Sequence, residues 1–383
     1  MPKSPNEQEK PKQMLTLNRL ICFICMAIPA LSSNAGAALY GFSEANPLTQ
    51  EEQKINLPTP PRKIINYRQA LRNNIDMIAD YAHAHDADFQ IILHEGEELL
   101  NKSLWEYHRD GYNQIRNKFN PQEDTSFLYK LPSEGNNNDM IAGTALPEFS
   151  KKINAIALNN VFCNNRKLSN VLKHSSLRLI SIDYCPNDEK YEESLQEAFG
   201  ENILFYGFTN LNNAFNNISK NLLISENAKN IFSMQDAKNI LFLTDDSNYT
   251  KSYDFIRNLQ NTNYDVIVIP SLFQNKEVFS PEDINSLKFK KNGTTRLVLA
   301  EMNITEANPL MYYWKKPWHK TPPEWIARAS FVNKDSYIAR YWHPDWQKLL
   351  GKHIQGIIQT GFSGVFITGI HNHTYFEAQE PLE

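Results

Sequence analysis

The stretch TRLVLAEMNI, residues 295–304, decides the fold that we predict. Its centre is a short, continuous apolar run, and polar side chains follow at once in NITEAN, residues 303–308. A strand that is apolar on both faces belongs to a parallel sheet covered by helices, because an exposed face would alternate with polar residues. The stretch therefore predicts a buried parallel strand whose carboxyl end carries polar groups.

The same pattern recurs along the chain, and helix-length segments separate the runs. YRQALRNNIDMIADYAHA, residues 67–84, places apolar side chains at helical spacing. Eight such units fit a closed (β/α)8 barrel, an α/β fold that takes about 250 residues plus insertions. We predict this single-domain, TIM-barrel-like fold. The alternative is a doubly wound open sheet, but no GxGxxG or Walker-type loop follows any run. The other runs are FQIILHE (89–95), LRLISIDYC (177–185), ENILFYGF (201–208), KNILFLTDD (238–246), YDVIVIPSLF (264–273), FSGVFITGI (362–370) and, as a weaker candidate, SYIARYW (336–342).

The composition is that of a globular protein. The 383 residues are 41% hydrophobic and 21% charged, with a formal net charge of −4. Nucleic-acid binding usually requires a clustered basic face, and short clusters such as Lys288, Lys290 and Lys291 do not provide one. We therefore expect no nucleic-acid partner.

The first forty residues differ from the rest. Basic residues precede the apolar run LICFICMAIPAL, residues 20–31, and small residues follow in SSNAGAA, residues 32–38. This order is typical of a secretory signal peptide, and the run is too short to span a membrane comfortably. We expect a signal peptide at 1–37, a linker at 38–61 and the barrel at 62–383. The protein is then exported to the periplasm or the cell exterior, with no stable membrane span after cleavage.

Two cysteines follow the predicted signal peptide, Cys163 and Cys185. Two cysteines do not form the disulfide framework of a small secreted domain. We expect two buried thiols in preference to a bridge, although an oxidising compartment would allow the pair to form.

Five segments resemble motifs of the endo-α-1,4-polygalactosaminidase-related proteins, glycoside hydrolase family 114. LVLAEMNITEANPLMYYWKKPW (297–318) is similar to that family's AYxSIGEAExYRxYW, and YWHPDWQKLL (341–350) is similar to YWDPEWQ. IIQTGFSGVFITGIHNHTYFE (357–377) resembles IIDAGFDGVYLDIVDxxEYFE, FQIILHEGEELL (89–100) resembles FxIIPQNGEEL, and LISIDYC (179–185) resembles LVVDYV. The resemblance spans residues 62–377 and implies a (β/α)8 barrel that acts on an amino-sugar polysaccharide, with no cofactor.

The order of these segments differs from the order usual in the family. There the QNGEEL and VDY segments follow the GVYLD segment, whereas here they come first. A closed barrel has no unique first strand, so a rotated order builds the same object if the chain ends are neighbours. We therefore expect Glu377 to end close to Arg62 and residues 207–237 to bridge the family's original ends.

Glycoside hydrolysis normally uses two carboxyl groups, which a barrel presents at the carboxyl ends of its strands. The resemblance implies that Glu306 is an acid or base, because it matches the glutamate of SIGEAE. It also implies a site role for Asp183, which matches the aspartate of VDY. The alternative roles are structural: a loop glutamate for Glu306 and a helix N-cap for Asp183.

Several positions where the resemblance expects a carboxylate carry another residue: Pro270, Thr368, His371 and His343. Neither proline nor threonine is an acid or base near neutral pH. Asn303 and Thr305 replace the serine and glycine of SIGE. The losses fall at strand ends, where the chemistry of a barrel enzyme takes place.

Other residues of the same segments offer substitutes. Glu95 stands where QNGEEL has asparagine, and Glu301 replaces the tyrosine of AYxS. A new pair can then combine Glu306 with Glu95, Glu301 or Asp183. We predict Glu306, Asp183 and Glu95 as catalytic residues. The predicted substrate-binding residues are His94, Glu301, Asn303, Trp314, Thr368 and His371.

Two of these assignments depend on the residue type. Trp314 is included because an aromatic face can stack on a sugar, although most of the chain's tryptophans are expected in the core. His371 and His373 form an H-x-H pair, which at a strand end is more typical of a polar loop than of a metal site. We predict no metal.

Two functions are consistent with these residues. The first is an exported glycoside hydrolase acting on an amino-sugar polysaccharide. The second is a catalytically inactive barrel that binds a glycan or a protein. The carboxylates lost at Pro270 and Thr368 favour the second, and the surviving Glu306 is the residue on which the first depends.

Overall fold

The computed structural model describes residues 64–103, 106–107, 109–110, 113, 144–218 and 225–379. These residues belong to one compact unit within Leu57–Glu383. The predicted signal peptide at 1–37, the predicted linker at 38–61 and Arg62 lie outside the described residues.

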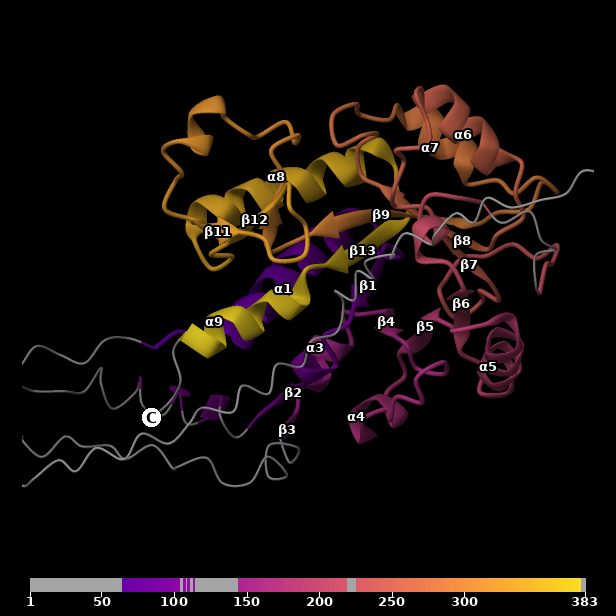
Figure 1. The fold of residues 1–383 in the computed structure, drawn as a ribbon, viewed down its shortest axis with the longest axis horizontal. Coiled ribbons are helices and arrows are strands. Elements are labelled where there is room, and N and C mark those ends of the chain that lie inside the picture. The colour runs from indigo at the N-terminus through magenta and orange to yellow at the C-terminus, as the bar shows by residue number, and fades with distance from the viewer. Residues whose placement is uncertain are drawn as a thin grey trace, which may run out of the picture. The chain divides into compact units, whose positions relative to one another are not determined.

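Eight parallel strands form a nearly closed barrel (Figure 1). The strands follow one another around the barrel in chain order, and the last of them pairs with the first. The predicted (β/α)8 fold is thus confirmed. In order the strands are β1 (Gln90–His94), β4 (Ala155–Asn159), β5 (Arg178–Tyr184), β6 (Leu204–Phe208), β7 (Ile240–Phe242), β8 (Val266–Pro270), β9 (Leu297–Asn303) and β13 (Gly364–Thr368).

One junction of the barrel lacks a backbone ladder. The hydrogen-bonded order begins at β6 and ends at β7, which lie close to each other without pairing. The Oη of Tyr206 donates to the carbonyl oxygen of Phe242 at 3.1 Å across this gap. The connection between the two strands, residues 209–239, contains the short 3-10 helix η3 (Leu211–Asn213) but no α-helix in its described part. We call this junction the β6–β7 seam.

The sequence prediction placed one barrel strand wrongly. SYIARYW gives β12 (Tyr337–Ala339), which belongs to a small antiparallel sheet outside the barrel. The eighth barrel strand is instead β4, with the sequence AIALN. Alanine has a weak preference for strands, so this run gave a poor signal. In the structure Ala155 and Ala157 pack inside the barrel.

Two apolar layers hold the barrel together. Alternate residues of each strand face inward, and they include Ile92 of β1, Leu299 of β9 and Phe366 of β13. The intervening residues, such as Ile91 and Val298, pack against the covering helices. This alternation fixes which strand-end side chains reach the barrel mouth.

Helices cover the outside of the barrel, and the helix predicted at 67–84 is confirmed as α1 (Tyr67–His85). Local signals set several ends: α8 (Pro344–Thr360) begins with proline and ends at Gly361, whose φ of 92° suits glycine. Among the described helices, none combines the length and apolar character needed to cross a membrane. The others are α3 (Pro147–Ser150), α4 (Asn170–Lys173), α5 (Asp188–Gly200), α6 (Ser252–Gln260), α7 (Pro281–Leu287) and α9 (His373–Gln379).

Two small sheets and three further 3-10 helices complete the described fold. Between β9 and α8 the chain forms the antiparallel sheet β10–β12–β11, and elsewhere β2 pairs with β3. These elements are β10 (Glu306–Ala307), β11 (Ile326–Ala329), β2 (Asn101–Lys102), β3 (Thr144–Ala145), η1 (Glu97–Leu100), η4 (Lys316–His319) and η5 (Ile370–Asn372).

The first and last described helices lie side by side (Figure 1). Arg68 Nε of α1 is 3.0 Å from Glu377 Oε1 of α9. Arg62 is outside the described residues, so its predicted closeness to Glu377 stays a prediction; Arg68 is the second residue of α1. Residues 207–237, which the sequence prediction assigned to bridging, run from the last two residues of β6 into the connection to β7.

Candidate functional site

Polar side chains gather at the carboxyl ends of β1, β9 and β13, which are adjacent in the barrel. We call this group, formed by His94, Glu95, Glu301, Glu306 and His371, the mouth site. Phe366 of β13 lies in register with Glu301 and its ring stacks on His94, while Asn372, the residue after His371, donates to Glu306. The position is the one at which barrel enzymes carry their chemistry.

Glu306 is buried and held in place. Its Oε1 accepts hydrogen bonds from Ser330 Oγ at 2.8 Å and from Asn372 Nδ2 at 3.2 Å. The bonds come from two different segments, the loop after β11 and the end of η5. The carboxyl group therefore has a defined orientation at the mouth.

Asn303, a predicted substrate-binding residue, shapes the turn that carries Glu306. Its Oδ1 accepts hydrogen bonds from the backbone N–H groups of Thr305 at 3.0 Å and Glu306 at 2.9 Å. Gly369 lies against this turn with a φ of +86°, and a Cβ there would be 2.3 Å from Asn303 Oδ1. The asparagine and the glycine thus form one packed turn, which leaves Asn303 with a structural role.

Glu301 faces into the barrel at the mouth. It follows the inward-facing Leu299 by two residues and lies in register with Pro270 on one side and Phe366 on the other. Among the described residues its carboxyl group has no hydrogen-bond or ion-pair partner. Burial raises the pKa of Glu301 from its ordinary value of 4.5 to about 7. A neutral-range pKa and a free carboxyl group make Glu301 a candidate proton donor.

Glu95, by contrast, is fully engaged. Its Oε1 accepts from the backbone N–H of Asn159 at 2.8 Å, and Arg166 Nη1 donates to both carboxyl oxygens at 2.8 Å. Arg166 Nη2 also donates to Glu97 at 3.0 Å. Glu95 holds a φ of 62°, an uncommon conformation for a residue other than glycine, and such residues cluster at functional sites. The arrangement fits a charged binding surface better than a proton-transfer role.

Burial disfavours the charged form of both histidines of the mouth site. Burial lowers the pKa of His94, whose Nε2 is 3.1 Å from Asn159 Oδ1 and whose ring stacks on Phe366. Burial likewise lowers the pKa of His371, and the neighbouring His94 adds to this effect. Neutral imidazoles at the mouth can each donate and accept one hydrogen bond.

Asp183 is not brought to the mouth site. The preceding residue, Ile182, faces into the barrel. Because side chains alternate along a strand, Asp183 lies on the outer face of β5, where it is fully buried. Its Oδ1 accepts from the backbone N–H groups of Phe162 at 2.9 Å and Cys163 at 2.7 Å. The carboxylate therefore fixes the loop after β4, much as a helix cap would.

Of the remaining predicted residues, Thr368 lies at the mouth and Trp314 does not. Thr368 ends β13 facing inward, in register with Asn303, and is buried at the mouth. Trp314 instead stacks on Tyr337 at a centroid distance of 5.1 Å and donates to His319 Nε2 at 3.2 Å. This aromatic cluster belongs to the segment between β10 and α8 and has no described contact with Glu306.

The H-x-H pair does not converge on one point. His371 is exposed, whereas His373 is buried with its Nε2 3.6 Å from Glu98 Oε1. In the described part of the chain, no three His, Cys, Asp or Glu side chains are grouped as metal ligands.

The expectation of two free thiols is wrong. Cys163 and Cys185 form a disulfide with a Cα–Cα distance of 5.2 Å. The bond joins the loop after β4 to the end of β5, because the two strands are paired neighbours whose carboxyl ends lie together. Adjacency of the two segments follows from the fold, so cysteine spacing alone could not reveal it.

Arg166, Ser330 and Asn372 were missed by the sequence prediction. Each lies outside the recognised motifs or at a position that the motif does not mark as chemical. The only usable signal was the run of acidic residues at 95–98, which requires a cationic partner if it is to be partly buried. No rule of spacing indicates which arginine supplies it.

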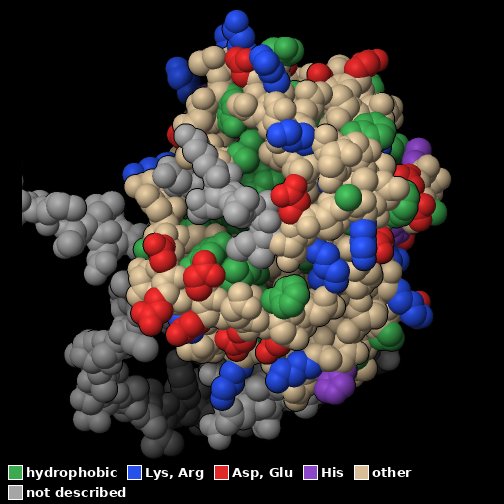
Figure 2. All heavy atoms as spheres, turned by 90° about the vertical axis from the view of Figure 1, so that its right-hand side faces the viewer, with side chains coloured by type: hydrophobic (Ala, Val, Ile, Leu, Met, Phe, Trp, Pro, Cys, Tyr) green, Lys and Arg blue, Asp and Glu red, His purple; other side chains and the backbone are tan. Residues whose placement is uncertain are grey.

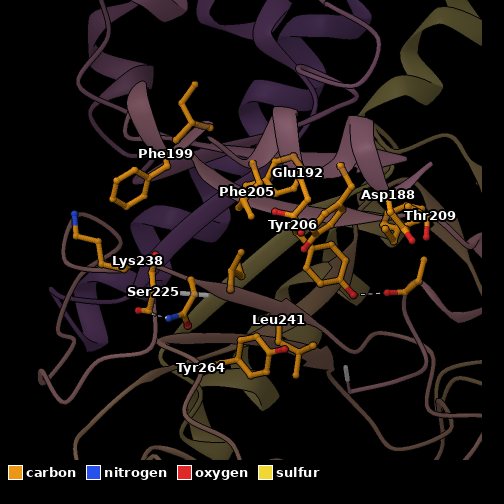
Figure 3. Close-up of a pocket in the computed structure, with 18 of the residues that line it drawn as sticks. Asp188, Glu192, Phe199, Phe205, Tyr206, Thr209, Ser225, Lys238, Leu241 and Tyr264 are labelled. Atoms are coloured by element: carbon orange, nitrogen blue, oxygen red, sulfur yellow. Dashed lines mark hydrogen bonds between the residues drawn. The ribbon is translucent and has the colours of Figure 1, made fainter. Parts of the chain in front are cut away.

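A separate cavity of 1090 Å³ lies at the β6–β7 seam (Figure 3). Aromatic side chains form part of its wall, among them Phe199, Phe205, Tyr206 and Tyr264, beside polar residues such as Glu192 and Lys238. Figure 2 shows the side of the molecule on which α5, β6 and β7 lie in Figure 1, and apolar side chains reach the surface there between charged ones. None of the sequence-predicted site residues lines this cavity.

Comparison with known proteins gives short matches to uncharacterized proteins. The chain is 32% identical over 123 residues to one from Methanocaldococcus jannaschii, covering 32% of this chain and 34% of that protein. It is 28% identical over 102 residues to one from Thermotoga maritima, with 27% and 30% covered. A Deinococcus radiodurans protein is 26% identical over 72 residues, with 19% and 23% covered. The matches thus span about a third or less of each relative, and no protein-family model matches the chain.

Proposed function

We propose that this protein is an exported glycoside hydrolase that cleaves an amino-sugar polysaccharide at the mouth site, with Glu301 and Glu306 as its two carboxyl groups. The position of Glu301 carries the proposal. It faces inward in register with Pro270, the position at which the resemblance to family 114 expects an aspartate. A carboxylate lost on β8 is therefore matched by one on the neighbouring strand, at the same level of the barrel.

The two carboxyl groups have the different environments that this chemistry needs. Glu301, with a pKa of about 7, retains its proton in part of the molecules at neutral pH. In the reaction its proton passes to the glycosidic oxygen as the bond from the anomeric carbon to that oxygen breaks. Glu306, oriented by Ser330 and Asn372, either attacks the anomeric carbon or accepts a proton from the attacking water. Water supplies the hydroxyl group of the new reducing end.

The charge at the mouth supports a cationic substrate. Glu95, Glu97, Glu301 and Glu306 lie near this end of the barrel, and Arg166 neutralises part of their charge. Burial lowers the pKa values of His94 and His371 and so disfavours positive charge on either ring. An acidic surface attracts an ammonium group, such as that of a sugar with a free amine.

The disulfide supports export. Disulfide bonds persist in oxidising compartments and are rare in the reducing cytosol. The bond between Cys163 and Cys185 agrees with the predicted signal peptide at 1–37, which lies outside the described residues.

A catalytically inactive barrel that binds a glycan or a protein is the second candidate. It is favoured by Pro270 and Thr368, which cannot act as acids or bases, and by the engagement of Glu95 with Arg166. The two candidates differ in one respect: only the hydrolase releases reducing ends.

The test compares three purified proteins. Wild type, Glu306→Gln and Glu301→Gln are incubated with acetylated and de-acetylated galactosamine polymers, and new reducing ends are measured. Each substitution should lower turnover by about 10²- to 10⁴-fold, the usual contribution of a positioned acid or base. Glu201→Gln is the matched control, because Glu201 is an exposed glutamate at the end of α5. Wild-type binding without turnover would favour the inactive barrel.

A further inference from the structure

The loop between β11 and β12, residues 330–336, exposes apolar side chains beside the mouth site. Phe331 is 61% exposed and Val332 is 74% exposed. Single exposed apolar residues are common and need no explanation. Here, however, the neighbouring Ser330 donates its hydroxyl hydrogen bond to Glu306 at 2.8 Å. The loop is therefore attached to a residue of the mouth site.

Hydrogen bonds within the loop fix the backbone on either side of Phe331. The backbone N–H groups of Val332 and Asn333 donate to Ser330 Oγ, each at 3.2 Å. The backbone N–H of Ser330 donates to the carbonyl oxygen of Ser336 at 2.8 Å. Ser330 therefore links the backbone on both sides of Phe331 to Glu306.

Two side chains support the ring of Phe331. The guanidinium carbon of Arg328 lies 3.7 Å from the ring centroid, and Tyr375 of α9 meets the ring edge-on at 5.5 Å. Arg328 also lies 5.6 Å from the centroid of Tyr375. We call these three residues the aromatic ledge. In Figure 1 the sheet β10–β12–β11 and α9 lie at the end of the barrel toward which β9 and β13 point.

We propose that the aromatic ledge is a further sugar subsite, which stacks a neighbouring ring of the polymer and prefers an uncharged, N-acetylated unit. The inference rests on the proposed function, since it takes the polymer bound at Glu306 as its ligand. One face of Phe331 is covered by Arg328, and the exposure of the ring leaves apolar surface for a sugar to cover.

The preference follows from the charge of Arg328. An exposed guanidinium repels an ammonium group and tolerates a neutral acetamido group. The mouth site has the opposite character, because carboxylates gather there. A polymer that carries free amines and acetylated units in alternation would then satisfy both surfaces.

The test measures the affinity of four proteins for two polymers by isothermal titration calorimetry. The probes are fully de-acetylated and partially N-acetylated galactosamine polymers of equal length. Phe331→Ala should weaken binding of the partially acetylated polymer by about five- to tenfold, the size of a lost stacking contact. Phe331→Trp, which keeps an aromatic face, should retain the wild-type affinity for this polymer. Phe232→Ala is the matched control, because Phe232 is 69% exposed and lies in the β6–β7 connection near the amino end of β9.

A further variant tests the charge of Arg328. Arg328→Met should strengthen binding of the fully de-acetylated polymer by about two- to fivefold, with little effect on the acetylated one, as expected for one exposed charge. If Phe331→Ala and Phe232→Ala bind alike, the ledge is not a subsite, whereas the proposed function stands. If wild type binds neither polymer, both proposals are overturned. Equal losses for the two polymers would overturn the preference for acetylated units.

Discussion

The two ends of the barrel bury charge in different ways. At the amino end, Asp265 and Lys290 are completely buried, with Lys290 Nζ 2.6 Å from Asp265 Oδ1. Asn227 Nδ2 and the backbone N–H of Lys238 also donate to Asp265, at 2.9 and 2.8 Å. Lys290 has a further acceptor in the carbonyl oxygen of Lys229 at 2.9 Å. We call this group the base cluster.

At the carboxyl end the partners are incomplete. Glu95 and Glu306 have theirs, but Glu301 has no hydrogen-bond partner among the described residues, and burial raises its pKa to about 7. Burying a charge without partners costs free energy, and a fold that needs only stability pairs or removes such groups. The base cluster is thus organised for stability, whereas Glu301 has the environment that the proposed function requires of a proton donor.

The largest expected effect is at the base cluster. Replacing Lys290 with methionine leaves Asp265 buried without its cation, and we expect the free energy of unfolding to fall by about 3–5 kcal/mol. Urea unfolding followed by circular dichroism measures it. Lys291→Met, at an exposed neighbour, is the control. Equal losses for the two variants would show that the base cluster is not a stabilising feature.

The next effect concerns how the mouth is held. Reduction of Cys163–Cys185 releases the loop that carries Arg166, and we expect a loss of about 2–4 kcal/mol, which is usual for a native disulfide. Thermal unfolding with and without reductant measures it, and a Cys163→Ala/Cys185→Ala variant should be insensitive to reductant. Identical melting of the oxidised and reduced wild type would contradict the prediction.

The third effect depends on pH. Because the folded protein raises the pKa of Glu301 from 4.5 to about 7, its protonated form favours folding below pH 4.5. That contribution is lost as the pH rises through about 7. Glu301→Gln removes this titration. The free energy of unfolding of the variant minus that of wild type should therefore be up to about 3 kcal/mol larger above pH 7 than at pH 4. Unfolding by urea across this range measures it, and a constant difference would show that Glu301 titrates normally.

The smallest effect is at the partly exposed ion pair. Arg166→Met leaves Glu95 with the backbone N–H of Asn159 as its described donor, and we expect a loss of about 1 kcal/mol. Lys167→Met, at the exposed neighbour, should change stability less. A loss as large as that of Lys290→Met would mean that the two ends of the barrel do not differ in the way described.

Much of the fold could be predicted from the sequence because buried parallel strands leave long apolar runs. Strands β5, β8 and β9 are rich in branched apolar residues and were found readily. The alanine-rich β4 was missed, and the tyrosine- and isoleucine-containing β12 was assigned to the barrel. Apolar runs do not distinguish a barrel strand from a strand of a small packed sheet.

The candidate site was less accessible to prediction. Glu306, His94 and His371 are at the mouth as expected from their strand-end positions, but Asp183 faces outward. A shift of one residue along a strand changes the face, so a motif match places a residue at a strand end without settling its direction. Arg166, Ser330 and Asn372 reach the mouth through contacts between distant segments, which a single sequence does not encode in a readable pattern.

The barrel consists of two halves of four strands each, which meet at the β6–β7 seam and again between β1 and β13. Strands β1, β4, β5 and β6 come from the first half of the described chain, and β7, β8, β9 and β13 come from the second. Among the described residues, the ladder that joins the halves runs between β1 and β13, where Gln90 pairs with Gly364. Contacts between such distant residues form slowly, because closing a long loop costs entropy. We therefore expect the two half-barrels to fold first and to join late. Pulse-labelling hydrogen exchange should show the amides of β1 and β13 among the last to be protected.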